Sequence, residues 1–445
     1  MTEIIMPRGA SVILNTLIDN GYDAYIVGGC VRDSLLGLVP KDWDICTEAT
    51  PLEVESCLSD YRILETGIKH GTVTVLMDDG QYEVTTFRED GEYSDNRRPD
   101  SVKFVKSIIS DLSRRDFTIN AMAYNDTVGL VDPYNGAKCL KNRIISCVGK
   151  SEDRFREDAL RIMRAIRFAS VYEFTISEDT ARAIHDNCNL LNNIAVERIN
   201  TELCKLIFGR DALNILLDYS DVFTTVIPEL KPCMDFSENN GHTVYEHIAR
   251  AVSNYNGDDL SVKIALLLQG LGKPYCYTED ENGGHFYGHG QIGGEIAASI
   301  VSRLRFDRKT QKDVAELVRL QDEVIEPTEK AVRRWLNRIG SVQLFRLLDV
   351  KLSNALARPE EVKSHIMELC DAVKRIAEEI IASKQCFKIE DLAINGFDVM
   401  SAGIPKGEQI GSILQAVLSL VIDGLLENDR NVLLGYIQSE RENLL

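Results

Sequence analysis

The feature that most constrains the fold of this chain is a change of hydrophobic periodicity near Ser151. After this point apolar residues recur at spacings of three and four up to the C-terminus, which is the period of an amphipathic helix. Before it, short helical patterns alternate with β-rich runs at residues 25–27, 43–46, 72–77 and 82–87. The pattern predicts an α+β chain with a small N-terminal α/β head and an all-helical remainder.

The length of the chain and its proline positions predict further divisions. A chain of 445 residues exceeds what one hydrophobic core usually supports. Pro228 and Pro232 interrupt the helical pattern, and residues 326–328, Glu-Pro-Thr, are typical of a helix restart. We therefore expect four parts, namely a head over 1–150, a neck over 151–227, a body over 228–326 and a tail over 327–445.

Composition narrows the functional classes. No stretch approaches the roughly 20 apolar residues that span a bilayer, and residues 1–20 lack a signal-peptide pattern, so we expect a cytoplasmic protein without a membrane partner. The 11 cysteines include no Cys-x-x-Cys pair, which predicts reduced thiols. A net charge of −19 argues against nucleic-acid binding by the whole surface and leaves local basic clusters, which are either binding sites or solvated helix faces.

Two glycines mark a candidate phosphate-binding turn. The apolar run 25–27 leads into Gly28 and Gly29, and a helical pattern follows directly over 31–36. Glycines let a phosphate approach the backbone, N–H groups at a helix start attract an anion, and the Arg32 guanidinium adds a forked cation. Such turns also occur in proteins that bind no phosphate, so the turn by itself leaves a structural role open.

Two carboxylates follow shortly after this turn. Asp42 and Asp44 lie in the segment 41–45, whose strand pattern puts both side chains on one face because strand side chains alternate with a period of two. Mg²⁺ prefers carboxylates, waters and substrate phosphates, so the pair beside the turn predicts a magnesium site for phosphoryl transfer. For an isolated Asp-x-Asp, a solvated strand pair is the favoured alternative.

Together these features resemble a known active-site motif. Residues 28–33, Gly-Gly-Cys-Val-Arg-Asp, followed by Lys-Asp-Trp-Asp at 41–44, resemble the motif of class II tRNA nucleotidyltransferases and bacterial poly(A) polymerases, within the DNA polymerase beta superfamily. The resemblance covers about residues 4–208. It implies a head with the polymerase beta-like fold.

The resemblance also implies roles for individual residues. Asp42 and Asp44 would hold the catalytic Mg²⁺, while Gly29 and Arg32 would contact the nucleotide. Polymerases of this superfamily often use a third carboxylate from a neighbouring strand, and Glu83 occupies a fitting position in a β-rich run. A structural strand carboxylate is an equally good interpretation of Glu83.

A second segment, Asp-Leu-Ser-Arg-Arg-Asp-Phe-Thr-Ile-Asn-Ala-Met at 111–122, resembles the ribose-binding motif of this family. The resemblance implies a nucleotide contact by Arg115. Asp116 and Asn120 offer acceptors and donors suited to ribose hydroxyls and phosphate. The alternative is that the arginines of this segment tie the head together, and Arg114 is a candidate for that role.

A third segment, residues 156–168, has polar side chains at every third position of a predicted helix, so that they lie along one slowly rotating face; they are Asp158, Arg161, Arg164 and Arg167. A carboxylate and a guanidinium at this spacing can meet the Watson-Crick edges of nucleobases. The segment resembles the Glu-Asp-x-x-Arg motif of the family. This implies that Asp158 and Arg161 choose between C and A, while Arg164 and Arg167 add nucleotide or phosphate contacts. Without the other motifs, a ladder of ion pairs would be favoured.

Two further segments bear on the activity. The polar segment 89–97 occupies the position of a loop that the family associates with switching from C to A, which favours addition of a complete CCA. The body resembles an HD phosphohydrolase domain, but Gln269 and Gly270 stand where that family has a metal-binding His-Asp pair. We therefore expect no phosphohydrolase activity. The less favoured alternative is a weak transition-metal site formed by His247, His285 and His289.

The resemblance implies template-independent addition of CCA to the 3′ end of tRNA from CTP and ATP. The reaction would be a two-metal nucleotidyl transfer with Mg²⁺, and protein side chains would select the base. By analogy with the family, the acceptor end of the tRNA would meet the head and neck, and its elbow would meet the tail. An A-adding nucleotidyltransferase, a poly(A) polymerase and a noncatalytic tRNA-binding protein remain alternatives. The sequence does not reveal the oligomeric state.

Overall fold

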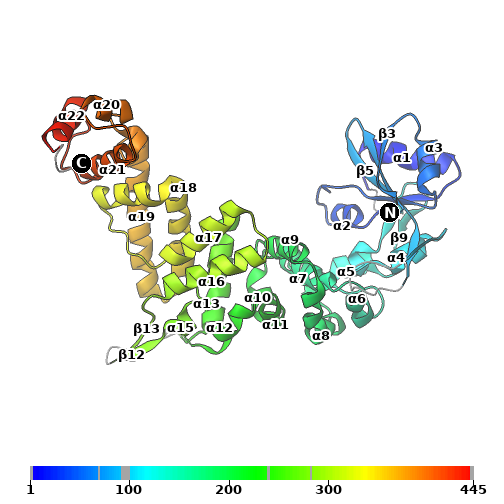
Figure 1. The fold of residues 1–445 in the computed structure, drawn as a ribbon. Coiled ribbons are helices and arrows are strands. Elements are labelled where there is room, and N and C mark those ends of the chain that lie inside the picture. The colour runs from blue at the N-terminus through cyan, green and yellow to red at the C-terminus, as the bar shows by residue number, and fades with distance from the viewer. Residues whose placement is uncertain (1–3, 69–70, 92–100, 238–240, 281–282, 441–445) are drawn as a thin grey trace. The chain divides into compact units, whose positions relative to one another are not determined.

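The computed structural model in Figure 1 describes residues 4–68, 71–91, 101–237, 241–280 and 283–440. The chain divides into two compact units, Met1–Pro228 and Glu229–Leu445. Pro228, where the sequence interrupts the helical pattern, lies at this boundary. The first unit combines a sheet with helices and the second is mostly helical, which confirms the predicted α+β class. The finer division into head, neck, body and tail stays a prediction.

A seven-stranded sheet organises the first unit and carries the blue and cyan strands of Figure 1. In spatial order the strands are β3 (Arg62–Gly67), β4 (Thr72–Met77), β5 (Gly80–Thr86), β2 (Ile45–Thr47), β1 (Ala24–Val27), β8 (Ala123–Asn125) and β9 (Gly129–Val131). Neighbours pair antiparallel except β2 and β5, which run parallel with Ile45 opposite Val84. The residues that precede Ile45 and Val84 therefore also lie side by side.

Helices pack around this sheet through apolar stripes. They are α1 (Arg8–Asp19), α2 (Gly29–Leu35), α3 (Pro51–Cys57), α4 (Ile108–Ser113) and α5 (Gly136–Asn142). On α1, the spacing of Ile13, Leu14 and Leu17 puts all three in the core. A small second sheet pairs β6 (Arg88–Asp90) with β7 (Val102–Phe104). Tyr25 and Phe87 are among the buried side chains of one core cluster of the head.

The rest of the first unit is helical, as the periodicity predicts, apart from the two-residue strands β10 (Ile144–Ile145) and β11 (Thr175–Ile176). Its helices are α6 (Ser151–Glu157), α7 (Leu160–Tyr172), α8 (Glu178–Asn187), α9 (Val196–Leu206), α10 (Ala212–Asp218) and α11 (Ser220–Val226). The expected single helix over 156–168 is wrong, because Asp158 between α6 and α7 has extended backbone angles, φ −138° and ψ 101°. Helical periodicity alone does not reveal such a break.

The second unit contains α12 (Lys231–Asp235), α13 (Val244–Asn254), α14 (Leu260–Leu268), α15 (Lys273–Cys276), α16 (His289–Arg303), α17 (Arg308–Leu320), α18 (Glu329–Ala355), α19 (Glu360–Ala382), α20 (Gly396–Ser401), α21 (Gln409–Ile422) and α22 (Arg430–Ser439). Two short strands, β12 (Thr278–Asp280) and β13 (Gly283–His285), pair antiparallel in this unit. The long helix α18 is kinked at Gly340, where φ is 79°. Within the described residues, no helix has the length and apolar character needed to cross a bilayer.

Candidate active site

The glycine turn forms at the junction of β1 and α2. Gly28 has φ 78°, a conformation that costs glycine little, and its N–H donates a 3.1 Å hydrogen bond to the Met122 carbonyl oxygen. A Cβ atom added at Gly28 would lie 3.0 Å from Nη1 of Arg115. The absence of a side chain at Gly28 therefore allows the Arg115 guanidinium to lie against the turn. The helix α2 begins at Gly29, two residues before the helical pattern predicted over 31–36.

Asp42 and Asp44 do not lie in a strand, which corrects the expected strand over 43–46. β2 begins only at Ile45, although the Val27 N–H still donates a 3.0 Å hydrogen bond to the Asp44 carbonyl oxygen. Both aspartates are exposed. No described side chain forms a hydrogen bond or ion pair with either carboxylate. The backbone of Asp44 is thus held against β1, and no direct contact with a described side chain compensates the charge of either acid.

A third carboxylate adjoins this pair. The parallel register of Ile45 with Val84 places Glu83 beside Asp44. Asp44 is exposed to solvent, but many protein atoms lie around its carboxyl group. The resulting partial loss of hydration is the main cause of its raised pKa. Arg115 lowers the pKa of Asp44, whereas Glu83 and Asp42 raise it. The three acids therefore act on one another electrostatically.

This arrangement fits a divalent cation. Across the described ranges, no group of three or more His, Cys, Asp and Glu side chains forms a complete metal site. Two exposed carboxylates suffice for a cation that takes its remaining ligands from water and substrate phosphates. Bound positive charge would also relieve the repulsion that raises the pKa of Asp44. The acids present therefore suit a metal ion that takes further ligands from water and substrate, and not one that is coordinated by protein side chains alone.

Arg32 is more enclosed than the sequence suggests. Its side chain donates from Nε to Asp33 at 2.8 Å and from Nη1 to the Asn120 side-chain oxygen at 2.6 Å. The rings of Phe168 and Tyr172 on α7 each lie 5.1 Å from its Cζ atom, measured to the ring centroid. With 7% of the residue exposed, the guanidinium is oriented before any nucleotide arrives.

Arg115 is anchored by an acid that the sequence left without a role. Its Nε and Nη2 atoms donate to Oδ2 of Asp111 at 3.3 and 3.0 Å. Burial by itself would raise the pKa of Asp111, but the charges of Arg115 and Arg114 lower it. Arg114 binds Asp111 at 2.8 Å and so has the tying role considered for it. The pairing leaves Arg115 close to both Gly28 and Asp44.

Asp158 occupies the break between α6 and α7 rather than the face of a helix. Its Oδ1 accepts a 3.1 Å hydrogen bond from the Leu160 N–H at the start of α7. Arg198 on α9 holds both carboxylate oxygens, through Nη1 at 3.3 Å and Nη2 at 2.9 Å. Arg198 went unnoticed in the sequence because it lies 40 residues away and belongs to no quoted motif. Its position in the amphipathic pattern of α9 carries no signal of this contact.

The three arginines of α7 are each paired with an acid. Arg161 donates to Glu157 at 2.6 Å and to the Arg114 carbonyl oxygen at 3.0 Å. Arg164 binds Asp116 at 2.6 Å, and Arg167 binds Glu202 on α9 at 2.5 Å. The ion pairs connect α7 with neighbouring elements as well as with α6, so the ladder considered for a single helix is instead a tertiary network.

Asp116 and Asn120 link the nucleotide-binding candidates to one another. Asn120 donates to Asp116 at 3.0 Å while it accepts from Arg32, and Asp116 accepts from Arg164. Burial alone would raise the pKa of Asp116, but Arg164, Asn120 and Arg161 bring it far below the usual range. The hydroxyl of Tyr172 adds a second link at the far end of α7 by donating to Asp33 at 3.0 Å.

The histidines of the second unit have separate partners. His247 is hydrogen-bonded to Asn354, His285 pairs with Asp280 at 2.9 Å, and His289 pairs with Asp322 at 2.7 Å. Gln269 is buried, and its backbone carbonyl oxygen accepts a hydrogen bond from the Gln321 side-chain amide. The described residues thus offer no metal cluster at these histidines. Of the segment 89–97, residues 92–97 lie outside the described residues.

Three family models match separate parts of the chain. The Poly A polymerase head domain matches residues 24–146. The model described as "Probable RNA and SrmB- binding site of polymerase A" matches residues 173–234, and tRNA nucleotidyltransferase domain 2 matches residues 289–437. Both units therefore contain matched segments.

Curated relatives extend this similarity along the chain. The CCA-adding enzyme of Geobacillus kaustophilus is 33% identical over 430 residues, which cover 96% of this chain and 95% of the relative. The CCA-adding enzyme of Ligilactobacillus salivarius is 46% identical over 239 residues, which cover 52% of this chain and 59% of the relative. In the second alignment the chain thus spans less than two thirds of its relative.

Solved structures agree with this relationship. The Bacillus stearothermophilus CCA-adding enzyme in complex with CTP superposes with a TM-score of 0.71 at 29% identity and covers 99% of both chains. A Thermotoga maritima CCA-adding enzyme complexed with tRNA has a TM-score of 0.63 at 20% identity over 98% of this chain and 97% of that one, which supports the fold alone.

Nucleotidyltransferases of this kind use divalent metal ions, which agrees with the exposed acids beside β2. The similarity to the Geobacillus kaustophilus enzyme runs through nearly the full length of both chains. The predicted family is therefore confirmed, and the chain belongs to the CCA-adding enzymes of the class II tRNA nucleotidyltransferases.

Proposed function

We propose that this chain adds C, C and A in turn to the 3′ end of tRNA, taking the nucleotides from CTP and ATP. The observation that carries the proposal is the full-length similarity to CCA-adding enzymes. The arrangement of charges in the first unit supports it, because exposed acids, an anchored arginine and a network of paired arginines occur together there. We further propose that the protein works in the cytoplasm.

The reaction needs no covalent enzyme intermediate. The tRNA 3′-hydroxyl attacks the α-phosphate of the bound nucleotide, a new P–O bond forms, the bond to the β-phosphate breaks, and pyrophosphate leaves. Mg²⁺ held by Asp42 and Asp44 would supply activation of the hydroxyl and neutralise the charge of the leaving group. Glu83 is positioned to join this site, since it neighbours Asp44 in the β2–β5 register.

The nucleotide would be held by residues that are oriented in advance. Gly28 and Gly29 have no side chain to keep a phosphate from their backbone, and Arg115 lies against the same turn. Arg32 would bind the nucleotide from its pocket of aromatic rings. Because the acid partners of both arginines fix their geometry, little side-chain entropy remains to be lost on binding.

Base choice would depend on Asp158 and Arg161. A carboxylate accepts hydrogen bonds from an exocyclic amino group, and a guanidinium donates to ring nitrogens or carbonyl oxygens. Arg164 and Arg167 would add nucleotide or phosphate contacts. The tRNA acceptor end would then meet the first unit, and by family analogy the predicted tail over 327–445 would meet the tRNA elbow.

The decisive experiment supplies the protein with Mg²⁺ and with tRNAs that end before CCA, after C and after CC. CTP and ATP are given singly and together, and product length is read on a sequencing gel. Addition that stops after CCA supports the proposal. Addition of A to the CC-ended tRNA only would identify an A-adding enzyme, and long A tails would identify a poly(A) polymerase.

A further inference from the structure

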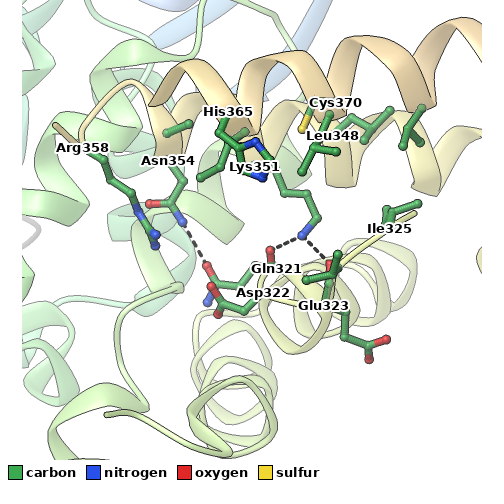
Figure 2. A pocket seen from close by; sticks show the side chains of 15 residues that line it. Gln321, Asp322, Glu323, Ile325, Leu348, Lys351, Asn354, Arg358, His365 and Cys370 are labelled. Carbon is green, nitrogen blue, oxygen red and sulfur yellow. Dashed lines mark hydrogen bonds between the residues drawn. The ribbon is translucent and has the colours of Figure 1, made fainter. Parts of the chain in front are cut away.

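A cavity of about 280 Å³ lies within the second unit, far along the chain from the residues proposed for nucleotidyl transfer (Figure 2). The connection 321–325 and parts of α18 and α19 line it. One wall is apolar and includes Ile325, Leu348, Leu369 and Val373. All active-site residues proposed above belong to the first unit, so this cavity is a separate candidate binding site.

Two acids at the rim of the cavity are already paired with basic side chains. Asp322 pairs with Nε2 of His289 at 2.7 Å. Glu323 is held in a two-point contact by Arg338, at 2.6 and 2.9 Å. Such paired carboxylates retain little attraction for a cationic ligand. The lining therefore does not favour a positively charged occupant.

One cation of the lining is bound only by neutral groups. The Lys351 amino group donates to the backbone carbonyl oxygens of Gln321 and Glu323 at 2.5 and 2.7 Å, as Figure 2 shows. These carbonyls satisfy its protons but bring no compensating negative charge. Burial lowers the pKa of Lys351, and the charge of Arg358 lowers it further against the opposing effects of Asp322 and Glu323.

A second cation has a free hydrogen-bonding face. Arg358 is half-buried at the cavity, and within the described part of the chain no side chain forms a hydrogen bond or ion pair with its guanidinium. It acts on Asp322 only through the longer-range field between charges. A guanidinium presents a planar fork that matches a carboxylate with two parallel hydrogen bonds.

We propose that this cavity binds a small monocarboxylate with an aromatic or branched apolar body. The carboxylate faces Arg358, and the body packs against Leu348, Leu369 and the remaining apolar wall. A dry apolar cavity of about 150 Å³ accommodates benzene, so the present volume suits a ligand of one or two rings. A phosphate dianion fits less well, because Asp322 stands near Arg358 and would repel the additional charge.

Titration of the full chain with 2-naphthoate by calorimetry tests this proposal. The neutral analogue 2-naphthalenemethanol has the same ring system without the carboxylate, and inorganic phosphate has the charge without the ring. We expect 2-naphthoate to bind at least about tenfold more tightly than either control, which is the range of one charge-assisted hydrogen-bonding contact. Equal affinity for 2-naphthoate and the alcohol, or no binding of 2-naphthoate at all, would overturn the proposal.

Two substitutions locate the binding. Arg358→Gln should weaken 2-naphthoate at least about tenfold and leave the alcohol unchanged. Arg375→Gln, at an exposed arginine of α19 outside the cavity, should leave the binding of both ligands unchanged. Leu369→Glu should weaken both aromatic ligands by filling the apolar wall with an acid. Circular dichroism checks that each variant is folded. Undiminished naphthoate binding by both Arg358→Gln and Leu369→Glu would place the ligand elsewhere and reject the site.

Discussion

The two halves of the proposed active site differ in whether their charged side chains form ion pairs. Beside β2, Asp42 and Asp44 are exposed, and no described side chain pairs with their carboxylates. On and around α7, the acids and arginines are joined in close ion pairs, from Asp158 with Arg198 to Arg164 with Asp116. The first arrangement leaves negative charge for a cation that arrives with the substrate. The second fixes geometry and suits recognition of a base by shape and hydrogen bonding.

The largest difference between the halves should appear in activity. Asp42→Ala and Asp44→Ala each remove a proposed metal ligand, so we expect nucleotide incorporation to fall by roughly 10³-fold or more, since a metal supplies several kcal/mol of transition-state stabilisation. The measurement is incorporation of CTP into a tRNA that lacks CCA. Asp60→Ala, at an exposed acid elsewhere in the head, is the control and should retain activity. Retained incorporation by Asp44→Ala would contradict the proposal that Asp44 is a metal ligand.

The next effect concerns the free energy of unfolding, which two Asp→Asn substitutions should change in opposite directions. The folded-state pKa of Asp116 is lowered, so its charge stabilises the fold above the unfolded-state pKa, and this contribution is lost as the pH falls. Asp116→Asn should cost about 2 kcal/mol, because the half-buried Arg164 loses its charged partner. The pKa of Asp44 is raised, so its charge opposes folding and Asp44→Asn should stabilise the metal-free protein.

Thermal unfolding in metal-free buffer at pH 7 measures both variants. Addition of a divalent metal should reverse the order for Asp44, because only the wild-type carboxylate gains from binding it. If Asp44→Asn lowers the melting temperature without metal, the acids beside β2 are compensated after all and the contrast between the halves fails.

Base selection should be sensitive to a residue that is proposed to touch no nucleotide. Arg198→Ala removes both side-chain contacts that hold Asp158, and we expect discrimination between CTP and ATP to fall by about tenfold or more, the range for a hydrogen bond to a charged group. The ratio of kcat/KM for the two nucleotides on a tRNA ending in C reports this change. Arg198→Lys should restore part of the discrimination. Arg210→Ala, at a highly exposed arginine, is the control, and unchanged selectivity in Arg198→Ala would make the pair purely structural.

The pH dependence sharpens the comparison further. Asp44 must lose its proton to bind a cation, and its pKa is raised by burial and by Glu83 and Asp42. Activity at limiting metal should therefore fall as the pH drops through this raised pKa. Glu83→Gln removes one like charge, so the acidic limb should move to lower pH. A raised metal requirement in the same variant would identify Glu83 as a ligand, whereas an unchanged acidic limb would show that it is electrostatically remote.

The smallest effect tests the link between α7 and the phosphate turn. Tyr172→Phe keeps the ring beside Arg32 but removes the hydroxyl that donates to Asp33. One such hydrogen bond contributes about 1 kcal/mol, so KM for the nucleotide should rise roughly fivefold, equally for CTP and ATP. Phe174→Leu, beside the ring of Tyr172 but without a contact to Arg32, is the matched control. A change confined to one nucleotide would indicate that this link belongs to base selection.

Local patterns in the sequence predicted the elements whose structure depends on nearby residues. The strand at 72–77 was placed correctly, and the helix after Gly29 follows the turn as expected, because alternation and helical periodicity are properties of neighbouring residues. The strand at Asp42 and Asp44 was wrong because β2 is short and its register depends on β1 and β5, which are distant in sequence. Asp44 nonetheless lies close to the glycine turn, since the Val27 N–H donates to its backbone carbonyl oxygen.

The contacts that hold the site together could not be predicted from local sequence patterns. Arg198 reaches Asp158 across 40 positions, and Tyr172 reaches Asp33 across 139. Neither residue differs in its own segment from an ordinary surface or core position of a helix. The spacing of three residues correctly predicted that the arginines share one helix, α7. Their acid partners come from several other elements and cannot be predicted from that spacing.

The break at Asp158 has a consequence for how such enzymes diversify. Because this acid stands outside any helix and is held by α9, its position can be adjusted by substitutions on a helix that is itself proposed to make no contact with the nucleotide. Preference for one base could then drift while the Glu-Asp-x-x-Arg letters stay intact. A substitution on α9 would leave that motif unchanged, so the motif would not record such a change.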